Sequence, residues 1–143
     1  VRTILPEAEE ALALGEYAAT MTLRNNLARA YFSLAQDDKA RHHYETITHS
    51  SQDPTLLCIA WARLAELYQR SKDSESKHHA LEQALTLLSQ TEFSVAHLSV
   101  ATAIAKYGTD KQVQQVMPFI KGFLETEAGQ EIQELLKQRV ASS

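Results

Sequence analysis

The sequence contains few residues that interrupt regular structure and few that form cross-links. Its 143 residues include only 4 glycines, 3 prolines and 1 cysteine. A single cysteine excludes an internal disulfide, and Cys58 lies in the apolar stretch LLCIAWARLAELY. Because a buried thiol behaves as a small hydrophobic side chain, we expect Cys58 to pack in the core, with a reactive thiol as the alternative. A reducing cytoplasm fits this cysteine usage.

The sequence also lacks an excess of basic residues and any long apolar run. It has 14 Lys and Arg against 18 Asp and Glu, a formal net charge of −4, whereas phosphate contacts need a basic patch. No apolar run approaches the ~20 residues of a membrane-spanning helix, and the first residues do not have the pattern of a signal peptide. We therefore expect neither direct nucleic-acid binding nor a membrane location. Because Val1 stands in place of Met, we expect a piece of a longer protein.

Helical periodicity is what the sequence does contain. Apolar residues make up 44% of the chain and recur at steps of three and four, the period of an α-helix. Short loops between helices of this length make neighbouring helices antiparallel. The pattern predicts one all-α domain, 1–143, with about eight helices, near 4–14, 17–34, 37–49, 54–70, 73–89, 93–107, 110–124 and 127–139.

Turn and cap residues support these boundaries. Gly15 and Gly108 stand where helix C-termini favour a left-handed residue. Pro118, inside VQQVMPFIKGFL, is expected to kink or divide its helix, because proline lacks the backbone N–H. N-caps are expected at four aspartates, Asp37, Asp53, Asp73 and Asp110.

One segment of the sequence repeats. LARAYFSLAQDDKARHHYETI, residues 27–47, returns as LAELYQRSKDSESKHHALEQA, residues 64–84, at an offset of 37 residues. In each copy a small alanine lets two helices approach closely, and a tyrosine three positions later fills the space beside it. The repeat therefore predicts two copies of one helical hairpin. The offset places Leu27 on Leu64, Ala28 on Ala65, Tyr31 on Tyr68 and His42 on His79.

These residues resemble the tetratricopeptide repeat family, whose first helix carries a large residue, Leu, a small residue and Tyr at fixed steps. Trp61 begins that series in the second copy, whereas Arg24 stands at the same place in the first, and Lys77 replaces a small residue of the family's second helix. Tyr107, with Ile104 in the small-residue position, marks a third, degenerate copy. The longer, Ala/Leu-rich repeats are also similar to the helical-repeat regions of large bacterial transcriptional regulators of the maltose-activator type.

The resemblance implies a right-handed superhelical array of antiparallel helix hairpins, an α-solenoid with a concave groove lined by first helices. In this arrangement 1–14 ends a preceding repeat, 17–49 and 54–89 are repeats, 93–124 is a degenerate repeat and 127–139 is a capping helix. The Lys/Asn set with which some members bind a terminal carboxylate is not matched here. Carried over, the groove positions are Asn25, Asn26, Arg29, Phe32, Ile59, Arg63, Glu66 and Arg70.

For Arg29 and Glu66 the alternative to a binding role is a simple surface ion pair. Histidine pairs occur at His42-His43 and His78-His79. Adjacent helical residues point about 100° apart, so neither pair can chelate a metal ion alone. We expect a solvated face, with an ion shared between stacked helices as the alternative.

The sequence contains no Gly-rich phosphate loop, nucleophile motif or paired carboxylates in a recognisable site, so we expect no catalysis, cofactor or metal. It predicts a protein- or peptide-binding scaffold module of a larger regulatory or signalling protein. The alternative is a small-molecule or signal-sensing domain of a bacterial transcriptional regulator. EIQELLKQRVASS is expected to cap one end, whereas ILPEAEEALALG is uncapped and predicts self-association through the N-terminal end.

Overall fold

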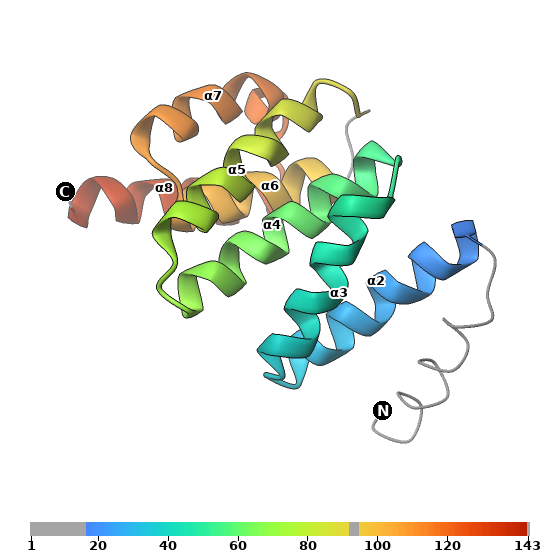
Figure 1. Cartoon of the computed structure of the whole chain (residues 1–143). Helices are drawn as coiled ribbons and strands as arrows, with labels where there is room; N and C mark the ends of the chain where they lie inside the picture. Colours follow the sequence, from blue (N-terminus) through green and yellow to red (C-terminus); the bar gives the residue numbers. More distant parts are fainter. Residues whose placement is uncertain (1–16, 92–94, 143) are drawn as a thin grey trace. The chain divides into compact units, whose positions relative to one another are not determined.

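The computed structural model describes residues 17–91 and 95–142 (Figure 1). All regular structure in these ranges is helical, with seven α-helices and no strand, which confirms the all-α prediction. The predicted helix 4–14, Gly15 and the expected self-association surface lie outside the described residues. The chain divides into two compact units, Val1–Gln52 and Asp53–Ser143, and each is described by itself.

The first unit is a helical hairpin. Helix α2 (Tyr17–Ser33) packs against helix α3 (Asp37–Ser50). Ala28, the small residue that the repeat marks for close packing, is fully buried in this hairpin, and Ala40 on α3 is also fully buried. The hairpin's other buried apolar residues are Met21, Leu27, Tyr31, Tyr44 and Ile47.

The second unit contains five α-helices and a short 3₁₀ turn. These elements are α4 (Pro54–Arg70), α5 (Ser74–Leu88), α6 (Val95–Tyr107), α7 (Asp110–Ile120), η1 (Lys121–Phe123) and α8 (Glu127–Ser142). Helix α4 packs against α5 and α6, and α6 also packs against α5, α7 and α8. Helix α6 is therefore the element that four other helices share. The largest fully buried aliphatic side chains of this unit are Leu64, Leu81, Leu88, Ile104 and Ile120, with Ile132 almost fully buried on α8.

Cys58 lies in this core. Its side chain has no exposed surface, and burial, followed by the nearby Asp53 carboxylate, raises the pKa of the Cys58 thiol to about 11. Because the thiolate is the reactive form, the structure confirms the core-packing interpretation and argues against a reactive thiol. None of the helices that the structure describes combines the length and the apolar character needed to cross a bilayer.

The two hairpin turns have the same backbone geometry. Ala35 and Lys72, which the offset of 37 residues places on each other, are the two non-glycine residues with positive φ in the described chain, at 58° and 62°. In the first turn the Gln36 N–H donates to the Tyr31 carbonyl, and in the second the Asp73 N–H donates to the Tyr68 carbonyl, both at 2.9 Å. This is the left-handed helix end that satisfies terminal carbonyls. The sequence repeat is therefore also a backbone repeat.

The cap predictions are partly right. The side chains of Asp53 and Asp73 accept from the backbone N–H groups of Thr55 and Ser76. The prediction is wrong for Asp37 and Asp110, which lie in the first turn, one residue after the N-cap positions Gln36 and Thr109. The Thr109 cap is strong because its hydroxyl and the Gln112 side chain satisfy each other's backbone N–H groups.

The prediction of a left-handed residue at Gly108 is also wrong, because no described glycine has positive φ. Glycine is needed there because the backbone of Ile104 lies close to position 108, and an added Cβ would lie 2.8 Å from the Ile104 carbonyl oxygen. The expected division at Pro118 occurs, because α7 ends at Ile120 and continues as the 3₁₀ turn η1. Proline cannot donate to the carbonyl four residues earlier, which weakens the helix at this point.

Helix α8 covers one side of α6. Ile132 is 2% exposed, and Arg139 donates from Nη1 to the Ala105 carbonyl at 3.2 Å and from Nη2 to Asp110 at 2.9 Å. These bonds attach α8 to the end of α6 and the start of α7. Ile132, on the apolar side of the predicted capping helix, is therefore buried within its own unit, while Leu135 and Leu136 are half-buried.

Candidate functional site

Helices α4 and α6 form the walls of an open pocket in the second unit. Its volume is about 200 Å³. Residues at helical spacing on α4 and α6 face it, so each helix contributes one continuous stripe. The lining residues are Ala62, Arg63 and Glu66 from α4, and Leu98, Ser99, Thr102, Ala103, Lys106 and Tyr107 from α6.

Small side chains create the hollow. Ala62 and Ala103, one on each helix, are 5% and 7% exposed and leave space where larger residues would fill it. Leu98 supplies an apolar wall, and Ser99 and Thr102 supply hydroxyl groups that donate or accept hydrogen bonds. The pocket therefore combines an apolar floor with polar groups, as binding sites usually do.

Glu66 is held by two partners within the unit. Its Oε2 accepts from Nη2 of Arg70 at 3.0 Å, one helical turn away, and its Oε1 accepts from the Tyr107 hydroxyl at 3.0 Å. The negative charge of Glu66 is therefore offset locally by Arg70. The two other charged groups of the lining, Arg63 and Lys106, are both cationic.

Tyr107 joins α6 to α4 through this contact. Burial, followed by the charge and the hydrogen bond of Glu66, raises the pKa of the Tyr107 hydroxyl from 10.0 to about 12. The phenol is therefore protonated across the physiological range and acts as a donor. Glu66 and Tyr107 together fix one edge of the pocket.

We expect replacement of Tyr107 by phenylalanine to reduce the loss of stability at alkaline pH. Below pH 10.0 the folded and unfolded chains both keep the phenolic proton. Between pH 10.0 and about 12 the unfolded chain loses this proton while the folded chain keeps it, so the wild-type free energy of unfolding falls as pH rises. Urea unfolding at pH 9 and pH 11 compares the two proteins. If the free energy of unfolding fell equally in the wild type and in Tyr107→Phe between these pH values, Glu66 would not protect the Tyr107 proton. Cys58 is present in both proteins, so it contributes equally to the pH dependence of their stability.

Three of the four predicted groove residues of α4 belong to this site. Arg63 and Glu66 line the pocket, and Arg70 binds Glu66. Ile59 is half-buried on α4 and is not among the residues that line the pocket. The α6 residues were missed because the groove positions were carried only onto the two clear repeats. The third copy already contained the signal, since α6 is its first helix and Tyr107 marks its end.

The other four predicted groove residues lie on α2, in the first unit. Nη2 of Arg29 donates to Oδ1 of Asn26 at 3.4 Å. Oδ1 of Asn25 is buried and has no hydrogen-bond partner. Phe32 is half-buried. These residues share a face of α2, while the pocket is built from the second unit alone. Their role as a binding surface stays a prediction.

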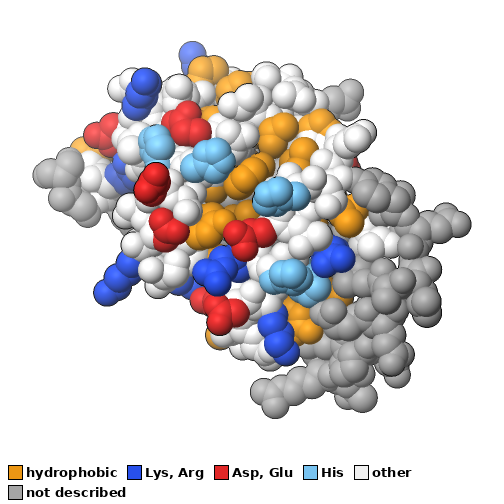
Figure 2. All heavy atoms as spheres, viewed as in Figure 1, with side chains coloured by type: hydrophobic (Ala, Val, Ile, Leu, Met, Phe, Trp, Pro, Cys, Tyr) orange, Lys and Arg blue, Asp and Glu red, His pale blue; other side chains and the backbone are white. Residues whose placement is uncertain are grey.

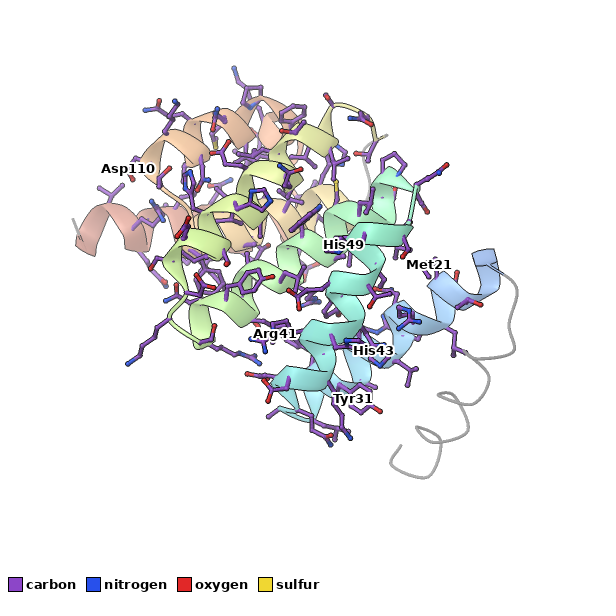
Figure 3. All side chains as sticks on the ribbon, in the orientation of Figure 1. Met21, Tyr31, Arg41, His43, His49 and Asp110 are labelled. Atoms are coloured by element: carbon purple, nitrogen blue, oxygen red, sulfur yellow. The ribbon has the colours of Figure 1, made fainter. Side chains whose placement is uncertain are left out.

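The prediction of a solvated histidine face is wrong for His43, which is only 4% exposed. Nη1 of Arg24 lies 2.9 Å from Nδ1 of His43, and the Tyr31 and His43 rings are stacked at 5.7 Å with an interplanar angle of 1° (Figure 3). A guanidinium only donates hydrogen bonds, so Nδ1 carries the lone pair in this contact. Arg24, the residue that departs from the repeat pattern, therefore accounts for the buried histidine.

The other three paired histidines, His42, His78 and His79, are exposed as expected. Within the described ranges, no group of three or more His, Cys, Asp or Glu side chains is arranged to hold a metal ion. On the face drawn in Figure 2, Lys and Arg side chains are interspersed with Asp, Glu and His and do not gather into one basic patch.

The described lining of the pocket contains neither His nor Cys, and its one carboxylate already accepts two hydrogen bonds. Comparison with models of known protein families, with curated proteins and with solved structures gave no match.

Proposed function

We propose that this chain is a non-catalytic module that binds a protein or peptide, and that the α4–α6 pocket is its recognition site. The observation that carries the proposal is the pocket between the first helices of two successive hairpins, lined by Arg63 and Glu66. In a stacked array of hairpins this is the position of the concave groove. The matched turns at Ala35 and Lys72 support the same tetratricopeptide-like arrangement.

The size of the pocket favours a side chain of a larger partner over a free small molecule. Ligand cavities usually enclose about 300–1,000 Å³ and surround most of the ligand. The pocket here measures about 200 Å³ and is open on one side. A single side chain of an extended segment fits this volume, with the rest of the segment lying along the helices. We therefore favour a scaffold function within a larger regulatory protein over small-molecule sensing.

Selection from a phage-displayed random peptide library tests this proposal. Ser99 lines the pocket on α6, so Ser99→Trp should fill it. Peptides selected on the wild-type domain should bind Ser99→Trp at least about 10-fold more weakly, the effect of losing one good polar contact or one buried side chain.

The matched control is Gln115→Trp, which places the same ring at an exposed position of α7. The control should bind the selected peptides as well as wild type, and thermal melts should show all three proteins folded. Peptides that bind Ser99→Trp and wild type equally would show that recognition occurs elsewhere, and the proposed site would then be wrong.

A further inference from the structure

The charged side chains that line the α4–α6 pocket are either engaged or exposed. Glu66 accepts from Arg70 and from the Tyr107 hydroxyl, and Arg63 also has an interaction partner in the structure. Lys106 is exposed, so its ammonium group keeps its hydration. The half-buried polar groups that the lining leaves for a ligand are therefore uncharged.

Ser99 and Thr102 are these uncharged groups. Both are half-buried on α6 and lie three residues apart, so they share one face of the helix. Other helical hydroxyls of the chain donate to a backbone carbonyl one turn earlier, as Thr46 does to His42 at 2.8 Å. Within the described ranges, neither the Ser99 hydroxyl nor the Thr102 hydroxyl makes such a bond or any other. Both are therefore available to a group that enters the pocket.

Starting from the proposed function, on which this inference depends, we propose that the pocket binds a primary amide, the side chain of Asn or Gln, on an extended partner segment. A hydroxyl donates and accepts hydrogen bonds, and an amide presents a carbonyl oxygen beside an NH₂ group. Residues three apart on a helix have Cβ atoms about 5–6 Å apart. One hydroxyl can therefore donate to the amide oxygen while the other accepts from the amide nitrogen. Ala62, Leu98 and Ala103 line the same pocket, beside the aliphatic part of the bound side chain.

Charged and apolar side chains fit this site less well. A carboxylate would lose hydration on entering, and the exposed Lys106 compensates little for that cost, as in other surface ion pairs. An ammonium group would also lose hydration, and the one carboxylate of the lining, Glu66, is already bound by Arg70. An apolar side chain would exclude water from both hydroxyls without replacing its hydrogen bonds. A neutral group that both donates and accepts avoids these costs.

The test uses peptides from the selection described above. Peptides that depend on the pocket, as judged by Ser99→Trp, should be enriched in Asn and Gln relative to the input library. In one such peptide, replacing the enriched Gln by Glu, or Asn by Asp, should weaken binding by about 10-fold or more in fluorescence anisotropy. Replacing Gln by Met, or Asn by Leu, keeps the size of the side chain, removes its hydrogen bonds and should weaken binding to a similar degree.

Removing the two hydroxyls from the protein supplies the second arm. Ser99→Ala/Thr102→Val keeps the shape of the pocket and should bind the amide peptide about 10-fold more weakly, because two hydrogen bonds are lost. Its affinity for the Met or Leu peptide should not fall, which separates a lost contact from general damage. The matched control is Thr86→Val/Ser89→Ala, which removes two exposed hydroxyls at the same spacing at the end of α5, outside the pocket. The control should bind both peptides as the wild type does.

The outcomes separate the two proposals. If the acid peptide binds as tightly as the amide peptide, or more tightly, and still depends on the pocket, the amide inference is wrong and the proposed function stands. The inference is also wrong if removing the hydroxyls weakens the amide and apolar peptides alike. If no selected peptide depends on the pocket, both proposals are wrong. If the double variant fails to fold in a thermal melt, Ser99→Ala replaces it, and unchanged affinity of that variant for the amide peptide would overturn the inference.

Discussion

Replacing His43 by alanine should destabilise the first hairpin by about 2–4 kcal/mol, and adding Arg24→Trp should recover much of that loss. The single change removes the stacked contact with Tyr31 and the hydrogen bond to Arg24. Aromatic stacking contributes about 0.5–1.5 kcal/mol, and a hydrogen bond to a charged group contributes about 1.5–3 kcal/mol. The His43→Ala change also leaves a second nitrogen of the Arg24 guanidinium unsatisfied, in addition to Nε, which is already buried without a partner.

The second hairpin supplies the reason for the expected rescue. The offset of 37 residues places Arg24 on Trp61 and His43 on Ala80. Ala80 is fully buried. The Trp61 and His79 rings are nearly perpendicular, with 5.6 Å between their centres. The two equivalent positions thus hold Arg and His in the first copy and Trp and Ala in the second. Replacing both members removes the unpaired buried donor, which is the costly part of the single change.

Urea unfolding followed by far-ultraviolet circular dichroism measures these effects. Trp61 is the one tryptophan of the wild-type chain, so its fluorescence reports on the second unit separately for the single variants. His42→Ala is the matched control, because His42 is exposed and adjacent, and should change stability by less than about 0.5 kcal/mol. A neutral His43→Ala would show that the buried pair contributes nothing. A double variant no more stable than the single would show that the two hairpins are not equivalent at these positions.

Local patterns in the sequence account for most of the fold. Helix boundaries followed from apolar periodicity, because burial of one helical face is a short-range pattern, and most differ from the structure by one or two residues. The N-caps were predicted one residue late, at Asp37 and Asp110. An aspartate is favourable both at the N-cap and in the first turn, where the helix dipole stabilises its charge, so its presence does not distinguish the two positions. Such differences depend on the geometry of one turn.

The site was harder to predict, because it depends on pairs of residues that are distant in the sequence. His43 and Arg24 each look like surface residues, and only their contact makes burial favourable. Tyr107 marked a third, degenerate copy of the repeat, but the groove positions were not carried onto that copy, so Lys106 and Tyr107 were not assigned to a site. Glu66 was identified as a groove residue, but its partners Arg70 and Tyr107 could be assigned only from the structure.

The two repeat tyrosines, which the sequence treats as equivalent, should differ in their contribution to stability. Tyr31 is 5% exposed, its ring stacks on His43, and Nζ of Lys39 lies 5.3 Å from the ring centre. Tyr68 is only half-buried. We expect Tyr31→Ala to cost about 3–5 kcal/mol, as for other buried aromatic side chains, and Tyr68→Ala to cost about 1–2 kcal/mol less.

Parallel urea unfolding curves compare the two alanine variants, with Tyr31→Phe and Tyr68→Phe as controls that keep the ring and remove the hydroxyl. Tyr31→Phe should retain most of the wild-type stability, because the stacked ring, rather than the hydroxyl, fills the space between α2 and α3. Equal costs for the two alanine variants would mean that the hairpins are packed alike and that His43 adds nothing to the first. A larger loss of stability for Tyr68→Ala than for Tyr31→Ala would contradict the difference in burial between the two tyrosines. It would also show that the cluster of Tyr31, His43 and Arg24 is not the main departure of the first hairpin from the repeat.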